Sequence, residues 1–141
     1  MIHQLSIFLE NTSGTLITVL QQLKKANVQL ISMTIADTAE YGILRIICAE
    51  PLRACEVLKE AGVAVALSDV FALELDNRPG SASDVVEAFS AANISLSYIY
   101  TFHLRGKGIM IFRTDNAEKA AQVIADNKFL ALEEKELAMW V

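Results

Sequence analysis

The sequence repeats itself at an offset of 66 residues, without a gap, and this repeat limits the folds that the chain can adopt. The identities fall at turns and on helix faces, and they pair Leu9-Glu10-Asn11 with Leu75-Asp76-Asn77, Ala26-Asn27 with Ala92-Asn93, and Gly42-Ile43 with Gly108-Ile109. Two copies are too few for a solenoid, which needs at least three repeats. We therefore predict two small domains produced by duplication, over residues 1–68 and 69–141.

The first copy has the pattern strand, helix, strand, strand, helix, strand. Apolar residues alternate at Leu5, Ile7 and Leu9, as in a half-buried strand. The following residues predict, in order, a helix with Leu16, Val19, Leu20 and Leu23 on one face, strands at 28–35 and 41–48, a helix from Pro51 to Gly62, and a strand at 63–67. The segment 36–40 is the predicted hairpin turn.

The second copy repeats this order. We expect a strand at 70–75, a helix at 81–92 with Val85, Val86 and Phe89 inward, strands at 94–102 and 108–113 around the turn Arg105-Gly106-Lys107, a helix from the cap Asn116 to Ala125, and a final strand within 130–139. The order β-α-β-β-α-β is that of ferredoxin-like folds. The fold class is therefore α+β, with two antiparallel sheets that each carry both helices on one face.

The hydrophobic content of the sequence predicts that part of the surface is covered by a partner. Hydrophobic residues make up 53% of the sequence, yet each of the two small predicted domains would bury only about 60% of its chain surface. Residues Leu96, Tyr98, Tyr100 and Phe102 form one apolar row on a predicted strand, so we expect a homodimer that covers part of such a surface.

Charge and targeting signals exclude several classes of partner. The net charge is −5 and the longest basic run is Lys24-Lys25, which argues against nucleic acid. The sequence has no signal peptide and no apolar run near the roughly 20 residues that span a bilayer, so we expect a cytoplasmic protein without a membrane partner. Cys48 and Cys55 are expected to be buried and reduced.

The segment that carries chemistry is a strand-to-helix loop present in both copies. It reads Asn11-Thr12-Ser13-Gly14-Thr15-Leu16 in the first copy and Asn77-Arg78-Pro79-Gly80-Ser81-Ala82 in the second. Glycine permits a sharp bend, and the N–H groups of the next helix suit a carboxylate. The asparagine amide adds donors and acceptors, so the loop suits an amino acid zwitterion. Asx turns that only shape the bend are the alternative.

The spacing Asn-x-x-Gly after a strand, within a β-α-β-β-α-β unit, resembles the ACT domain family over essentially the whole chain. Asn77-Arg78-Pro79-Gly80 is the nearer match to the family's usual Asn-x-Pro-Gly, whereas Ser13 departs from it. The resemblance implies an amino-acid-binding regulatory protein without cofactor, with its ligand at a domain or subunit interface. The candidate site residues are Asn11, Thr12, Ser13, Gly14, Thr15, Leu16, Asn77, Arg78, Pro79, Gly80, Ser81 and Ala82, with Met33, Tyr98 and Ile99 from second strands.

Competing functions remain. The chain could instead be a regulatory subunit that docks onto a separate enzyme of amino acid metabolism. A small enzyme of the acylphosphatase type would need a phosphate-binding loop with an arginine, and Arg78 has only Thr12 as its counterpart, so we predict no catalysis. His3 and His103 lack metal-ligand spacing, the run 133–136 is interpreted as a solvated strand edge, and Trp140 as a packing anchor.

Overall fold

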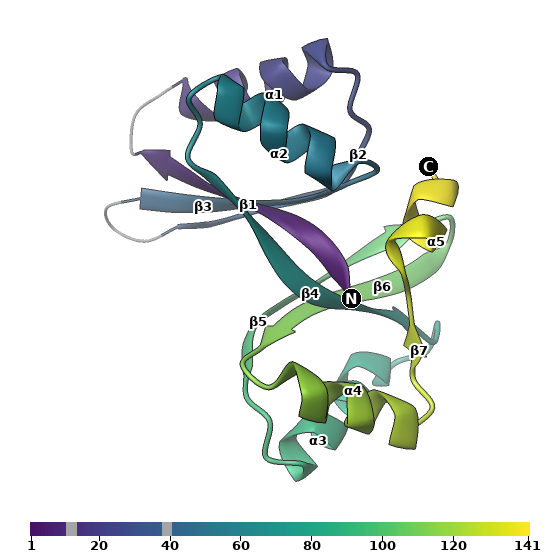
Figure 1. Ribbon diagram of the computed structural model, residues 1–141. Helices are drawn as coiled ribbons and strands as arrows, with labels where there is room; N and C mark the ends of the chain where they lie inside the picture. The colour runs from purple at the N-terminus through teal and green to yellow at the C-terminus, as the bar shows by residue number, and fades with distance from the viewer. Residues whose placement is uncertain (11–13, 38–40) are drawn as a thin grey trace. The chain divides into compact units, whose positions relative to one another are not determined.

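The computed structural model describes residues 1–10, 14–37 and 41–141 and divides the chain into two compact units (Figure 1). The N-terminal unit contains His3–Ser68 together with Leu137–Met139 and Val141. The C-terminal unit contains Asp69–Glu136 together with Met1–Ile2 and Trp140. Each unit has the predicted β-α-β-β-α-β order, and each is described below by itself.

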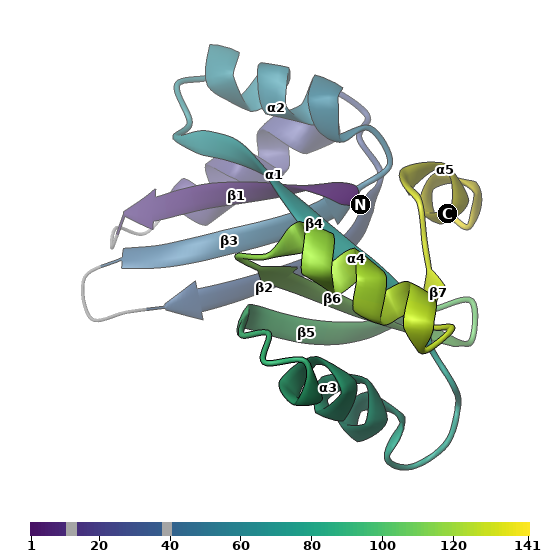
Figure 2. The same ribbon diagram turned by 60° about the horizontal axis from the view of Figure 1, so that its bottom comes forward.

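The N-terminal unit is a four-stranded sheet with two helices on one face (Figures 1 and 2). Its elements are β1 (Ile2–Glu10), α1 (Thr15–Lys25), β2 (Leu30–Asp37), β3 (Tyr41–Cys48), α2 (Pro51–Glu60) and the first part of β4 (Val65–Leu75). Antiparallel pairing joins β1 to β3 and β3 to β2. The other side of β1 meets the chain entering β4, where the Phe8 amide donates to the Ala64 carbonyl at 3.1 Å.

The C-terminal unit repeats this arrangement. It consists of the remainder of β4, then α3 (Ser81–Ala91), β5 (Leu96–Leu104), β6 (Lys107–Thr114), α4 (Ala117–Asp126) and β7 (Leu130–Ala131). The strand order is β7-β4-β6-β5, all antiparallel, and α3 and α4 cover one face (Figure 2). The short helix α5 (Glu134–Met139) follows β7.

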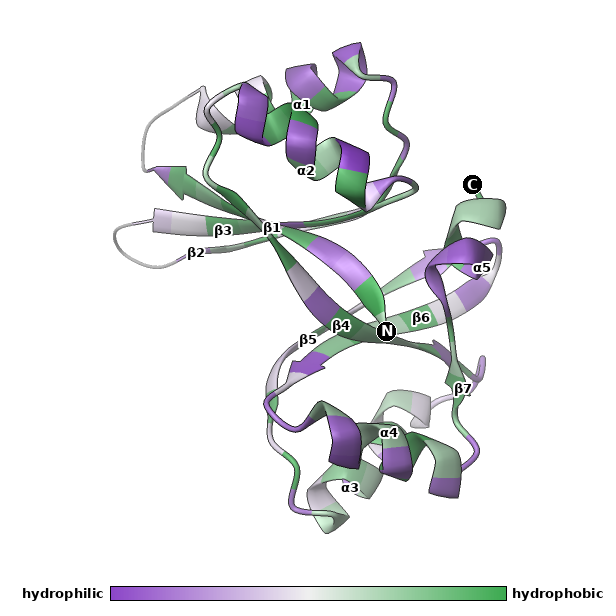
Figure 3. Cartoon of the chain, in the orientation of Figure 1, coloured by the Kyte–Doolittle hydropathy of each residue, from purple (hydrophilic) through white to green (hydrophobic). Residues whose placement is uncertain are grey.

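Each unit has its own hydrophobic core between the sheet and its helices. The strands are largely hydrophobic, whereas the helices alternate hydrophobic with hydrophilic residues (Figure 3). Leu5, Ile7, Val19, Leu23, Leu44, Ile46, Ala54 and Leu58 fill the N-terminal core; Leu73, Val85, Phe89, Met110, Phe112 and Ala120 fill the C-terminal one. The rings of Phe89 and Phe112 lie 4.9 Å apart. The predicted fold class is confirmed. The alternation of hydrophobic residues along the strands and their helical spacing in the helices had predicted which faces form the cores.

Several predicted boundaries are also confirmed. The Asn116 side chain accepts a hydrogen bond from the Lys119 amide at 3.1 Å and caps α4. Pro51 occupies the first turn of α2, and Gly62 follows its end with a φ of 80°.

Cys48 and Cys55 are buried and form no disulfide within the described chain. No helix in the described ranges is long and apolar enough to cross a membrane.

The break predicted between two strands is wrong, and so is one predicted helix face. The predicted strands 63–67 and 70–75 are parts of one continuous strand, β4, because no glycine or proline interrupts the segment between them. Val86 was expected to face inward, but 39% of it is exposed, and the inward positions of α3 belong to Val85 and Phe89.

The C-terminal acidic run is the other correction. The final strand is only two residues long, and Glu134–Met139 is helical, so residues 133–136 are not a strand edge. The Glu133 amide donates to Glu136 Oε1 at 3.3 Å, as the N3 glutamate does in a capping box. Acidic side chains are favourable at a helix N-terminus because of the helix dipole. The spacing of Glu133 and Glu136 is a sequence signal for a helix, although the run was interpreted as a strand edge.

A bidentate ion pair at the start of α2 includes an arginine that also binds the end of α1. Arg53 donates to both carboxylate oxygens of Glu50, at 3.2 and 2.6 Å, and its Nη1 also donates to the Ala26 carbonyl at the end of α1, at 2.6 Å. The hydrogen bond from Arg53, and then its charge, lower the pKa of Glu50 from the usual 4.5. A carboxylate with a lowered pKa stabilises the fold above its unfolded pKa, and this contribution is lost as the pH falls through the folded pKa.

We therefore predict that Arg53→Met lowers the melting temperature at pH 7, because it removes the contacts to Glu50 and Ala26. The difference from wild type should shrink as the pH falls below 4.5 and through the lowered pKa of Glu50 in the folded state, since protonated Glu50 no longer forms the ion pair. Thermal unfolding followed by circular dichroism measures this. In Glu50→Gln, which keeps the Arg53–Ala26 contact, the loss at pH 7 should be smaller; a loss that is independent of pH would contradict the role of Glu50.

Candidate functional site

Both strand-to-helix loops bend at a glycine in the left-handed region. Gly14 has a φ of 103° and Gly80 a φ of 85°, and each is the N-cap residue of the helix that follows. Neither α1 nor α3 has a side-chain hydrogen bond at its N-cap. The glycine carbonyls accept the first helical bonds, from Thr18 and Asp84, both at 3.0 Å. The N-terminus of α3, the positive end of its helix dipole, therefore has no side-chain cap.

The first loop is only partly described. Asn11, Thr12 and Ser13, three of the candidate residues, lie outside the described residues. Gly14 and Thr15 line a pocket of about 520 Å³, whose other lining residues are Phe8, Glu10, Thr18 and 61–64. Leu16 packs against the hydrophobic core of its unit. Met33 lies on β2 with 46% of its surface exposed and is not a lining residue of this pocket.

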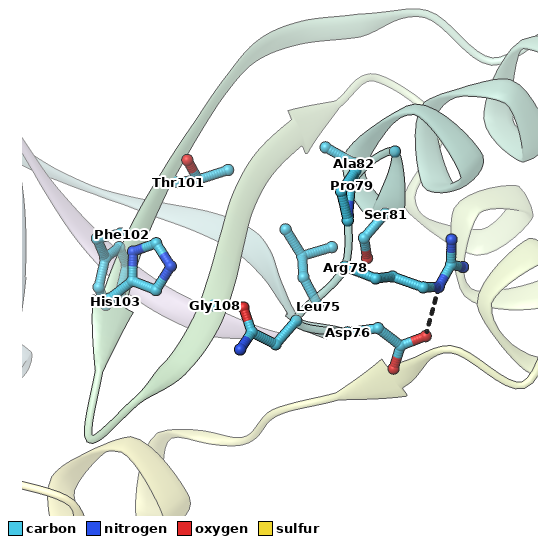
Figure 4. Close-up of a pocket in the computed structure, with 12 residues that line it drawn as sticks. Leu75, Asp76, Arg78, Pro79, Ser81, Ala82, Thr101, Phe102, His103 and Gly108 are labelled. Atoms are coloured by element: carbon cyan, nitrogen blue, oxygen red, sulfur yellow. Dashed lines mark ion pairs between the residues drawn. The ribbon is translucent and has the colours of Figure 1, made fainter.

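The second loop lines a pocket of about 450 Å³ within the C-terminal unit (Figure 4). One side is the continuous segment 75–82, which includes the candidates Asn77, Arg78, Pro79, Gly80, Ser81 and Ala82. The facing side is formed by Thr101, Phe102 and His103 of β5 and by Gly108 of β6. The structure thus brings together the whole second loop and one end of the second strand of the same copy.

The pocket exists because a glycine stands where a side chain would fill it. Leu75 pairs with Gly108, and Gly108 pairs with His103, so the three residues form one row across β4, β6 and β5. A Cβ on Gly108 would lie 3.5 Å from Leu75 Cβ and 4.0 Å from His103 Nε2. The row therefore has a hollow between two side chains, and Pro79 and Ser81 of the loop before α3 line the same pocket (Figure 4).

The hairpin turn sets this row. Arg105 and Gly106, with φ of 51° and 77°, form a two-residue turn of the type that matches strand twist. Counting outward from the turn fixes His103 opposite Gly108. Lys107 Nζ lies 4.7 Å from the centre of the Trp140 ring, and Arg105 Nε donates to the Trp140 carbonyl at 2.5 Å. Trp140 is thus in contact with the tip of the hairpin that carries the pocket wall.

Arg78 forms ion pairs with two carboxylates of its own unit. It bonds to Asp84 at 2.7 Å and lies 3.5 Å from Asp76. The hydrogen bond with Asp84, supported by that residue's charge, raises the pKa of Arg78 above its usual value. In Figure 4 its guanidinium lies on the opposite side of the loop from His103. Arg78 therefore closes the loop onto α3, and its charge is balanced before any ligand arrives.

Comparison with known proteins decides the family. The model of the ACT domain pair matches residues 1–141. The chain belongs to the ACT domain pair family. Its fold is similar to that of protein BT0572 from Bacteroides thetaiotaomicron, which is 35% identical over 97% of this chain and 95% of that chain, with a TM-score of 0.91.

More distant structures share the fold of the ACT domain pair. The regulatory subunit of aspartate kinase from Thermus thermophilus, in its ligand-free form, is 15% identical over 88% of this chain and 91% of that one, with a TM-score of 0.61. The aspartokinase alpha and beta subunits are likewise 15% identical, over 88% and 90%, with a TM-score of 0.58. No curated protein matches the chain.

Two of the strand candidates in this ACT domain pair lie away from the second pocket. Tyr98 and Ile99 belong to β5, but the pocket is lined three residues further along, at Thr101–His103. The repeat contained a signal for the residues that line the pocket. Gly108 aligns with Gly42 and lies just beyond the hairpin turn, opposite His103. Within the described residues, no group of three or more His, Cys, Asp or Glu side chains could hold a metal ion.

The two glycines of the second pocket allow a matched test of its backbone. Gly80→Ala should lower the free energy of unfolding by about 1 kcal/mol, because alanine is strained at a φ of 85° although its Cβ would meet no atom within 4 Å. Gly108→Ala should leave it unchanged or slightly higher, because its Cβ would make only ordinary contacts. Urea unfolding measures both; equal losses would show that the bend at Gly80 carries no special strain.

Proposed function

We propose that this ACT domain pair is a non-catalytic regulatory protein that binds a free amino acid in the pocket between the second loop and β5. The observation that carries the proposal is a pocket of about 450 Å³ with an uncapped helix N-terminus at one end and hydrogen-bonding side chains along its wall. Its volume falls within the roughly 300–1,000 Å³ of small-molecule sites. The pocket lies in an ACT domain, and the resemblance of the sequence to that family implies an amino acid as the ligand.

The pocket suits a zwitterion for electrostatic reasons. The backbone N–H groups at the start of α3 favour a carboxylate, and the helix dipole adds to this. Asp76 and the amide of Asn77 line the same pocket and suit an ammonium group. In this pose the two charged ends of the ligand lie along the loop, and its side chain extends toward Gly108 and β5. The first loop is proposed as an equivalent or vestigial site.

A homodimer is part of this proposal. β2 and β5 each form an outer edge of their unit's sheet, and Met33, Ile35 and Ile99 on them are 42–47% exposed. Exposed sheet edges with apolar side chains invite pairing with another chain. Binding at such a site would shift the equilibrium between arrangements of the subunits, which is how a small ligand is converted into a regulatory signal. We propose the cytoplasm as its compartment.

The alternative function is docking onto a separate enzyme of amino acid metabolism. It is supported by the solved structures of the same fold that are regulatory subunits of aspartate kinase. The exposed pair Phe8 and Tyr41, with ring centres 5.7 Å apart, offers an aromatic surface for such a contact. Docking without a ligand would leave the melting temperature unchanged by every free amino acid.

A thermal-shift panel of the twenty amino acids tests the proposal. A ligand present at 100 times its dissociation constant stabilises the folded state by about 2.7 kcal/mol, which corresponds to several degrees here. Trp140 is the only tryptophan and lies against the hairpin that carries the pocket wall, so its fluorescence should also change on titration. If no amino acid changes either signal, the sensor proposal is wrong and docking becomes the better explanation.

Gly108→Ala should abolish the response to the ligand while leaving the unliganded melting temperature unchanged. The added methyl group occupies the hollow between Leu75 and His103 without a clash. Gly42→Ala is the matched control, because its Cβ would have similar room, 3.6 Å from Ile35 Cγ2 and 3.7 Å from Leu9 Cβ, but lies in the other copy. Retention of the full shift in Gly108→Ala, with loss in Gly42→Ala, would move the site to the first copy.

A further inference from the structure

We infer that His103, assisted by Thr101, selects an amino acid with a neutral hydrogen-bonding side chain, a hydroxyl or an amide, over apolar ligands of the same shape. This inference rests on the proposed function, because it concerns the part of the same pocket that the ligand's side chain would reach. It assigns a specificity role to a residue for which the sequence indicated only a surface or interface position.

The register places both polar side chains toward the ligand. His103 pairs with Gly108, and Thr101 pairs with Met110 of the helix-side core, so both lie on the face of β5 that carries α3. Phe102 pairs with Ile109 and therefore points to the opposite face. Figure 4 shows His103 and Thr101 on the side of β5 toward Leu75 and the loop. The wall that meets the ligand's side chain is thus an imidazole and a hydroxyl.

His103 is available for such a contact. Its side chain forms no hydrogen bond or ion pair with any other described residue, and Gly108 leaves an open space in front of its Nε2. A neutral imidazole offers one donor and one acceptor, and the threonine hydroxyl can act as either. A ligand hydroxyl or amide can pair with both groups, whereas a methyl group in the same place would leave them without a partner once water is excluded.

The charges around the pocket argue for a neutral side chain. Asp76 and Asp84 share the single positive charge of Arg78, at 3.5 and 2.7 Å, so the three groups together carry one net negative charge. On the neighbouring strands, Lys107 and Glu74 form a balanced pair at 3.3 Å. The one excess negative charge, on the loop, is the charge proposed above to hold the ligand's ammonium group, which leaves none on β4, β6 or the loop to attract a charged side chain.

The first copy shows that this wall is not a general consequence of the fold. At the offset of 66, Thr101 corresponds to Ile35 and His103 to Asp37. Asp37, Gly42 and Leu9 form the equivalent row, and Ile35 Cγ2 lies 3.6 Å from the position of a Cβ on Gly42. A methyl group and a carboxylate stand where the second copy has a hydroxyl and an imidazole. The preference for a neutral polar side chain belongs to the second copy.

Pairs of isosteric ligands provide the test. Dissociation constants of threonine and valine, and of asparagine and leucine, are measured by calorimetry for the wild-type chain, His103→Leu and His103→Gln. In the wild type the polar member of each pair should bind about tenfold more tightly, the effect of roughly one hydrogen bond to an otherwise unpaired group. His103→Leu should bring each ratio close to one, and His103→Gln should retain most of it.

The readout is a ratio, so a merely structural effect of the substitutions does not move it. His103 is exposed, and both variants should keep the wild-type melting temperature. If amino acids bind but the ratios are the same in His103→Leu as in wild type, or if valine and leucine bind more tightly from the start, this inference is wrong while the proposed function stands. If the wild type binds no amino acid at all, the proposed function fails and this inference fails with it.

Discussion

The register of the second hairpin is the constraint on which the candidate site depends. A two-residue turn with both residues at positive φ fixes His103 opposite Gly108, and the next ladder fixes Gly108 opposite Leu75. A slip of one residue would turn every side chain of β5 to the other face of the sheet. The imidazole would then leave the pocket, and the aromatic ring of Phe102 would enter it. Turn chemistry therefore decides the chemistry of a pocket wall that begins two residues from the turn on each strand.

Duplication has preserved the left-handed glycine before the first helix of each copy, but not the groups that bind beside it. In the first copy, the Thr18 hydroxyl donates to the Gly14 carbonyl at 2.9 Å. In the second, Asp84 stands at the equivalent position and binds Arg78 of the loop itself. A neutral hydrogen bond is thus found at the start of α1, and an ion pair at the start of α3. Because the loops differ in charge and the walls differ in polarity, the two copies present different sites within one family fold.

The elements that the sequence predicted well are those set by local physical chemistry. Asn116 and Pro51 mark helix starts because a side-chain acceptor and a fixed φ act within one turn of chain. Gly14 and Gly80 mark bends because only glycine adopts their backbone angles without strain. The start of helix α5 is also set locally, because Glu136 accepts a hydrogen bond from the Glu133 amide. The acidic residues there were nevertheless interpreted as a strand edge.

By itself, the sequence determined the number of copies, the order of their elements, the core faces and the place of the glycine loops, because periodicity and turn residues act over short distances. Tertiary structure decided that β4 is one strand, that Val86 is exposed, and that Thr101 and His103, rather than Tyr98 and Ile99, form the wall beside the second loop. These outcomes depend on which residues of separate strands lie opposite one another, and hydrogen-bond register is settled only when the sheet assembles.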